Sequence, residues 1–155
     1  MRRRALVPAA ALAAVLAAAA VAGAQGATPE ASEAVIALSF RGSHRAYPLG
    51  IFADRRIVND VVGSMEIAVF HDPERDLSTA WFRTVFGEPI EFSAAANGIL
   101  AEDLTTITRW DMTTGVAVAG NLVGQRLVPI PFTKTGWGAW IAAHPEAQVY
   151  RPEGR

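Results

Sequence analysis

A group of potential metal ligands lies near the middle of the chain, where His71, Asp72 and Glu74 occupy three of four consecutive positions. Imidazole and carboxylate groups are competent ligands for zinc, manganese or iron. A site of this kind needs a third or fourth ligand from elsewhere, for which His44 or Asp103 is available. The stretch also fits a solvated loop, because Asp-Pro commonly starts a turn. The sequence therefore predicts either a mononuclear divalent metal site at His71 and Asp72 or a turn without chemistry.

A second candidate site is the run Asp103-x-x-Thr106-x-Thr108-x-Trp110. If this run is a strand, Thr106, Thr108 and Trp110 share one face, since alternate side chains point to the same side. Hydroxyl groups beside an indole favour a ligand groove with an aromatic floor, of the kind that receives sugars or extended peptides. The same pattern also fits a structural role, in which Trp110 belongs to the core and the threonines stabilise strand pairing.

Three further polar residues are candidates for ligand binding. Asn59 and Asp60 are predicted to form a turn between two strands, because either side chain can hydrogen-bond its own backbone. Arg83 has the planar donor fork that recognises anions, and it also fits a paired or snorkelling arginine among apolar strand residues. The predicted binding surface combines the Asn59-Asp60 turn with the strand that leads to Trp110.

The order of these motifs resembles a known family, domain of unknown function 3179. The matching elements are Tyr47-Pro48-Leu49, Ile57-Val58-Asn59-Asp60-x-x-Gly63, Asp103-x-x-Thr106-x-Thr108-x-Trp110, Trp137-x-x-Trp140 and His144-Pro145. Many members of that family carry Tyr-Cys-Pro-x-Cys after the Asn-Asp block, whereas this chain reads His71-Asp72-Pro73-Glu74-Arg75 and has no cysteine. A thiol-based mechanism is therefore excluded here. The resemblance implies a fold and an exported protein, but no reaction.

Turn residues recur at short intervals between residues 33 and 150, which favours a mainly β domain. The predicted strands are 35–40, 45–51, 57–58, 65–70, 80–86, 90–94, 105–110 and 116–119, with a hairpin turn at 87–89 and another tight turn at Asn97-Gly98. One short C-terminal helix is predicted, capped by Thr135 and ending at His144, with Trp137, Trp140 and Ile141 on one face. We expect a single compact barrel- or sandwich-like domain, with the aromatic face of the helix covering an open side.

The N-terminal segment has the three parts of a secretory signal peptide. Arg2, Arg3 and Arg4 precede a small apolar run that ends in Ala22-Gly23-Ala24. We predict a signal peptide over residues 1–24 with cleavage near Ala24, a flexible lead-in over 25–32 and one β-rich domain over 33–155. A retained membrane anchor is the alternative, because the run approaches the roughly 20 residues of a membrane span.

Composition limits the partners of the exported chain. Without cysteine it has neither a lipidated N-terminus nor a disulfide, so we expect a soluble periplasmic or extracellular protein with no stable membrane anchor after cleavage. The formal net charge is −1, and loss of the arginine-rich signal peptide makes the chain more acidic. This charge argues against nucleic acid and anionic membranes as partners.

The sequence favours a non-catalytic binding or accessory module for a small molecule, a glycan or another exported protein, with no cofactor expected. Two alternatives stay open. One is a metal-dependent enzyme that uses His71 and Asp72 for hydrolytic or redox chemistry. The other is a family member that lost its chemistry with its cysteines and persists as a folded partner of another exported protein.

Overall fold

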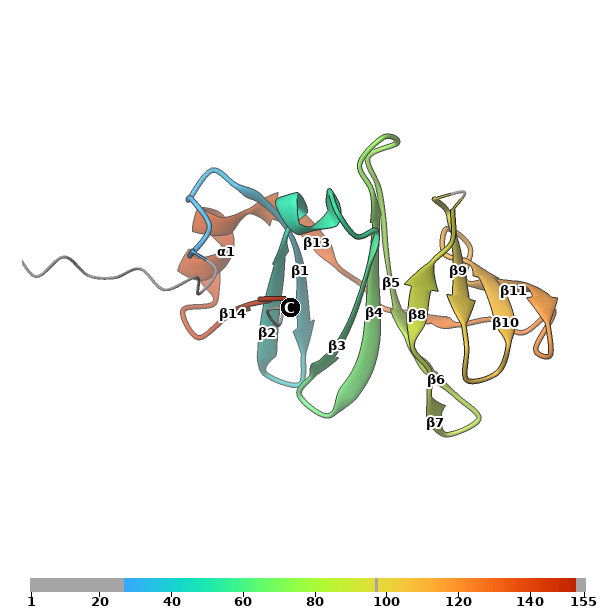
Figure 1. Ribbon diagram of the computed structural model, residues 1–155. Helices are drawn as coiled ribbons and strands as arrows, with labels where there is room; N and C mark the ends of the chain where they lie inside the picture. The colour runs from blue at the N-terminus through green and yellow to red at the C-terminus, as the bar shows by residue number, and fades with distance from the viewer. Residues whose placement is uncertain (1–26, 97, 153–155) are drawn as a thin grey trace, which may run out of the picture.

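The computed structural model describes residues 27–96 and 98–152, so the predicted signal peptide and Asn97 lie outside the described residues. The chain is mainly β with one short C-terminal helix, as the sequence predicts. Its elements form successive layers, with the helix at one end followed by three four-stranded sheets (Figure 1). None of the sheets in the described part closes into a barrel. Of the two predicted architectures, a barrel and a sandwich, the structure has the layered, sandwich-like one.

The first sheet carries the helix. Its strands, in spatial order, are β13 (Thr133–Gly136), β1 (Ala34–Phe40), β2 (Ser43–Pro48) and β14 (Gln148–Val149). β1 and β2 correspond to the first two predicted strands and form an antiparallel hairpin, and β14 runs parallel to β2. Both faces of β1 are buried, with Val35 and Ala37 packed on the helix side and Ile36 and Leu38 facing the second sheet.

The second sheet is the central layer. Its strands are β12 (Val128–Pro129), β5 (Leu77–Phe82), β4 (Met65–Asp72) and β3 (Ile57–Val62), and the 3-10 helix η1 (Leu49–Phe52) precedes it. The alternation in β4 predicts a half-buried strand, but both faces are covered. Ile67 and Val69 pack toward the first sheet, whereas Ala68 and Phe70 pack toward the third. A layer on each side of the sheet explains why the whole centre of β4 is buried.

The third sheet lies at the end opposite the helix (Figure 1). Its strands are β11 (Val116–Gly120), β10 (Thr108–Asp111), β9 (Leu100–Asp103) and β8 (Phe92–Ala94), and a small hairpin of β6 (Thr84–Val85) and β7 (Glu88–Pro89) precedes it. A hairpin turn does occur near the predicted 87–89, but it lies at Phe86 and Gly87, because Glu88 and Pro89 form β7. β8, however, pairs with β9 rather than with the strand before that turn.

Two predicted boundaries near the second sheet are wrong. Asn59 and Asp60 lie inside β3, paired with Ala68 and Ile67 of β4, and the turn follows at Gly63, whose φ is 64°. Asn59 bonds to Phe92 and Asp60 to Tyr47, and the backbone of both residues stays extended although Asp60 also accepts from the N–H of Val61. The strand predicted over 45–51 ends at Pro48, where η1 begins.

The strand predicted over 105–110 and the helix cap also differ from the structure. Thr105 and Thr106 belong to the turn between β9 and β10, so the strand begins only at Thr108. α1 (Trp137–Ala143) follows Gly136, and no side chain caps it.

Thr135 is paired with Val35 in the first sheet. The first helical N–H groups instead find backbone acceptors, since Trp137 donates to the Glu33 carbonyl at 2.8 Å and Gly138 to the Ala31 carbonyl at 2.9 Å. Within residues 27–96 and 98–152 no helix is both long and apolar enough to cross a bilayer.

Candidate functional site

A cleft of about 590 Å³ opens beside β2, β3 and the segment that follows β14. Its charged lining residues are Arg45, Arg55, Asp60, Arg83 and Arg151, and we call it the arginine cleft. Asn59, Val61, Val149 and Tyr150 complete the lining. The fold therefore brings together at one cleft three residues that the sequence predicts to bind a ligand, namely Asn59, Asp60 and Arg83.

Asp60 organises one wall of the arginine cleft. Its Oδ2 accepts a hydrogen bond from the Tyr47 hydroxyl at 2.8 Å and lies 3.3 Å from Nε of Arg45. Its Oδ1 accepts from the backbone N–H of Val61 at 2.8 Å. Burial, reinforced by the neighbouring Asp60 carboxylate, raises the pKa of Tyr47, so the phenol remains a donor. Both oxygens of Asp60 are thus occupied, and the residue serves to position Arg45.

Arg83 contributes a buried guanidinium, with only 6% of the residue exposed. One Nη donates to the carbonyl of Ile90 at 2.9 Å, and the other forms an ion pair with Glu66. Its Nε has no hydrogen-bond partner among the described residues. A buried donor without a partner is unfavourable, so this N–H is an unsatisfied group beside the cleft.

Asn59 has a structural role beside the cleft. Its Nδ2 donates to the carbonyl of Phe92 at 2.9 Å, and its Oδ1 accepts from the N–H of Phe92 at 3.0 Å. Both functional atoms of the amide are thereby occupied. Asn59 ties β3 to the start of β8 and leaves recognition to its neighbours.

Arg55 and Arg151 bring exposed guanidinium groups to the cleft. Neither makes a hydrogen bond or ion pair with any other residue that the structure describes. Beside them, the ring of Tyr150 stacks on that of Tyr47, with the centroids 5.4 Å apart. The arginine cleft therefore combines two engaged arginines, two free ones and an aromatic wall.

The predicted site at Asp103 is a closed hydrogen-bonded turn. Asp103 is buried, and its Oδ1 accepts from the backbone N–H of Thr105 at 2.8 Å and of Thr106 at 3.0 Å. Its Oδ2 accepts from the Thr106 hydroxyl, which also lies 2.9 Å from the Thr108 hydroxyl. The Thr108 hydroxyl accepts in addition from the N–H of Leu122 at 3.2 Å. These groups satisfy one another and hold the β9–β10 turn.

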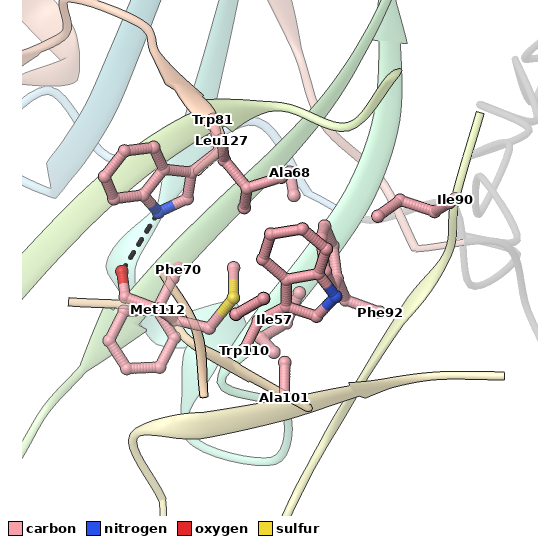
Figure 2. Packing of buried hydrophobic residues seen from close by; sticks show 11 residues of the cluster. Ile57, Ala68, Phe70, Trp81, Ile90, Phe92, Ala101, Trp110, Met112 and Leu127 are labelled. Carbon is pink, nitrogen blue, oxygen red and sulfur yellow. Dashed lines mark hydrogen bonds between the residues drawn. The ribbon is translucent and has the colours of Figure 1, made fainter. Parts of the chain in front are cut away.

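Trp110 lies in the core and is 0% exposed. Figure 2 shows its indole among Phe92, Ala101 and Ile57, with the Phe92 ring edge-on at a centroid distance of 6.1 Å. The indole therefore offers no floor to a surface groove. A hollow of about 320 Å³ does lie outside the turn, lined in part by Asp103 and Thr108.

His71 and Asp72 are consecutive residues at the end of β4, so their side chains point to opposite faces. His71 Nδ1 lies 2.9 Å from the Ser78 hydroxyl, and burial lowers the pKa of His71. Asp72 is fully buried between Arg56 at 2.6 Å and Arg75 at 2.5 Å. The hydrogen bond from Arg75 lowers the pKa of Asp72, and Arg56 adds to the effect.

This arrangement does not support a metal site at His71 and Asp72, because both oxygens of Asp72 are held by cations. Three possible ligands do come together elsewhere in the described part of the chain, namely His44, His144 and Glu146. His71 is not one of them.

Four residues of the arginine cleft were not predicted from the sequence. None of these residues belongs to a sequence motif of catalytic or ligand-binding type; they are Arg45, Arg55, Tyr150 and Arg151. The first and the last are 106 positions apart (151 − 45). The number of arginines in the sequence does not indicate a binding site, because isolated arginines are ordinary surface residues.

Comparison with family models gives a match to the model described as "Protein of unknown function (DUF3179)" over residues 14–155. Comparison with curated proteins and with solved structures gave no match. The matched span includes the arginine cleft, the Asp103 turn and the stretch from His71 to Arg75, where this chain has no cysteine. The chain belongs to the DUF3179 family of proteins of unknown function.

Proposed function

We propose that this protein is a non-catalytic binding module that recognises an anionic ligand in the arginine cleft and acts outside the cytoplasm. The single observation that carries the proposal is the convergence of Arg45, Arg55, Arg83 and Arg151 on one cleft. Guanidinium groups present planar donor forks that match carboxylate and phosphate oxygens.

The charge of the lining supports an anion. Among residues 27–96 and 98–152, Asp60 is the only acidic residue that lines the cleft alongside its four arginines, so the described lining is positive although the whole chain is slightly acidic. Arg45 is held in place by Asp60 and by the carbonyl of Val61 at 3.3 Å. Arg55 and Arg151 have no competing partner in the described chain and are free to bind.

The occupied groups argue for recognition rather than catalysis. A general base needs a carboxylate or imidazole with a free acceptor. The carboxylate of Asp60 instead accepts from Tyr47 and the Val61 N–H and pairs with Arg45. By contrast, the polar groups of the Asp103 turn satisfy each other, and the one arginine that lines the hollow beside that turn, Arg109, is paired with Glu102.

The size of the cleft indicates the class of ligand. About 590 Å³ lies within the roughly 300–1,000 Å³ of small-molecule pockets. We infer a carboxylate- or phosphate-bearing small molecule or a short acidic glycan. The basic and alanine-rich N-terminal segment supports export of the module, after which it would meet such ligands in the periplasm or the medium.

Isothermal titration calorimetry with citrate, inorganic phosphate and an oligogalacturonate tests the proposal. We expect at least one probe to bind, with affinity that falls as salt is added. Arg55→Gln and Arg151→Gln should each weaken binding by about 10-fold, which corresponds to the loss of one charge-assisted hydrogen bond.

Arg126→Gln is the matched control, since it removes an equal charge from an exposed residue that does not line the cleft. An equal effect of all three substitutions would reduce the interaction to net charge and contradict a specific site. Failure of every probe to bind would contradict the anionic ligand class.

A further inference from the structure

Two histidines and a glutamate from separate segments meet at one end of the first sheet. His44 belongs to β2, His144 ends α1, and Glu146 follows two residues later. One ligand atom from each lies within 4.8 Å of the other two. Ligand atoms of a tetrahedral zinc ion stand about 3.4 Å apart, as bond lengths near 2.1 Å require. The three atoms therefore have to draw closer around a bound ion, through rotation of their side chains.

The ring of His44 is already oriented for such a role. Its Nδ1 lies 2.7 Å from the hydroxyl of Ser39, which directs Nε2 toward Glu146 at 3.1 Å. A hydrogen bond at one ring nitrogen is the usual way in which proteins fix a metal-binding histidine and expose the other nitrogen. The His44 side chain is 14% exposed, so its orientation is restrained by packing.

His144 is fixed by the end of the helix. Its backbone N–H donates to the Trp140 carbonyl at 2.9 Å, and its ring lies 4.2 Å from the Trp140 ring, centroid to centroid. The imidazoles of His44 and His144 stack with centroids 4.0 Å apart and planes 23° from parallel. Because the two ring planes are nearly parallel, one ion can be bound by both imidazoles only if the side chain of His144 turns out of the stack until its nitrogen faces the ion beside Glu146.

We propose that His44, His144 and Glu146 bind a divalent cation of the zinc class. Two imidazoles and one carboxylate are a ligand set that zinc accepts, with water in the fourth position. His44 and Glu146 also line a hollow of about 170 Å³, which gives room for that water. The proposal does not rest on anion binding in the arginine cleft, although Arg45 lines both hollows.

An ion pair between protonated His44 and Glu146 is the competing explanation, because it uses the same two atoms. The two explanations differ in what they expect of His144. An ion pair needs only one imidazole, whereas the metal site needs both.

Cobalt titration of the chelator-treated chain, purified without a histidine tag, tests the proposal. We expect one equivalent of Co²⁺ to give visible absorption bands that one equivalent of Zn²⁺ abolishes, and Zn²⁺ to raise the thermal midpoint. His144→Ala and Glu146→Gln should each weaken binding at least about 10-fold, and Ser39→Ala by about 10-fold through loss of orientation.

Glu146→Gln protects the test against misfolding, since the Glu146 side chain is 63% exposed. His71→Gln is the control that removes a histidine outside the site and should leave the cobalt spectrum unchanged. Absence of a one-to-one complex in the parent, or a spectrum that survives both His144→Ala and Glu146→Gln, would overturn the proposal. A change of thermal midpoint in Glu146→Gln without any metal-dependent shift in the parent would assign the cluster to the ion pair.

Discussion

The side-chain amide of Asn59 bonds both backbone polar groups of Phe92, since Nδ2 donates to the carbonyl at 2.9 Å and Oδ1 accepts from the N–H at 3.0 Å. Asn59 lies in β3 of the second sheet and Phe92 starts β8 of the third. One side chain thus imitates a strand pairing between two layers. Asn59 of the Asn-Asp motif therefore links the second sheet to the third, which a residue that only formed a turn would not do.

Asn59→Ala should lower the free energy of unfolding by about 2 to 3 kcal/mol, because it leaves the N–H and carbonyl of Phe92 without partners. Urea unfolding followed by tryptophan fluorescence measures the change. Asn121→Ala is the control, since Asn121 is exposed and should change stability by less than about 0.5 kcal/mol. Equal costs for the two substitutions would contradict the link between the layers.

Two buried tryptophans should differ in their tolerance of phenylalanine. Trp81 Nε1 donates to the Thr79 hydroxyl at 2.9 Å and to the Met112 carbonyl at 3.0 Å, whereas Trp110 Nε1 has no partner in the described chain. Trp81→Phe should therefore cost about 1 kcal/mol more than Trp110→Phe, through loss of hydrogen bonding.

Trp110→Ala should lower the free energy of unfolding by about 3 to 5 kcal/mol because it leaves a cavity in the core. Thermal and urea unfolding of the three variants check these values. A larger cost for Trp110→Phe than for Trp81→Phe would show that shape, not hydrogen bonding, dominates at these sites.

Gly120 and Gly124 share a positive φ but differ in their surroundings. At Gly120, with φ of 96°, an added Cβ would lie 2.1 Å from the backbone oxygen of Ile107, whereas at Gly124, with φ of 89°, it would meet nothing within 4 Å. Gly124→Ala should cost about 1 to 2 kcal/mol from backbone strain alone. Gly120→Ala adds a clash with backbone and should cost about 3 to 5 kcal/mol. Equal thermal midpoints for the two variants would exclude the close approach of the chain at Ile107 to Gly120.

His71 should make stability fall on acidification. Burial lowers the pKa of His71 below its ordinary 6.5, with the charge of Lys134 adding to the effect and those of Asp76 and Asp72 opposing it. The unfolded chain therefore binds this proton at a higher pH than the native chain does. The contribution is fully present above pH 6.5 and is lost as the pH falls below that value toward the native pKa.

His71→Gln should consequently flatten the decline in unfolding free energy as the pH falls below about 6.5. Urea unfolding of the parent and the variant at several pH values measures both slopes. Identical slopes would show that His71 takes up its proton equally in both states.

Elements set by neighbouring residues are predictable from the sequence. The β1–β2 hairpin follows from a strand-forming run interrupted by Gly42, whose φ of 80° suits glycine at the turn. The C-terminal helix follows from Trp137 and Trp140, whose spacing of three places both on the buried face. In both cases the deciding interactions lie within a few residues along the chain.

The role of a polar residue such as Asn59 depends on how the sheets stack on one another. Asn59 was predicted to bend its own backbone, yet Phe92, 33 positions away, supplies better-placed partners once the second and third sheets stack. Asp103 shows the opposite case, because its partners Thr105 and Thr106 are local. Its acceptor role was therefore visible in the sequence, although the strand assigned to those threonines was not correct.

Local hydrogen bonding and hydrophobic periodicity are properties of short segments, so the sequence alone specifies a mainly β chain with a terminal aromatic helix. Where guanidinium groups gather depends on contacts between distant segments. Arg45 and Arg151 become neighbours of Arg55 and Arg83 only because β14 pairs in parallel with β2 and the first sheet packs on the second. The tertiary structure alone therefore decided the position of the arginine cleft.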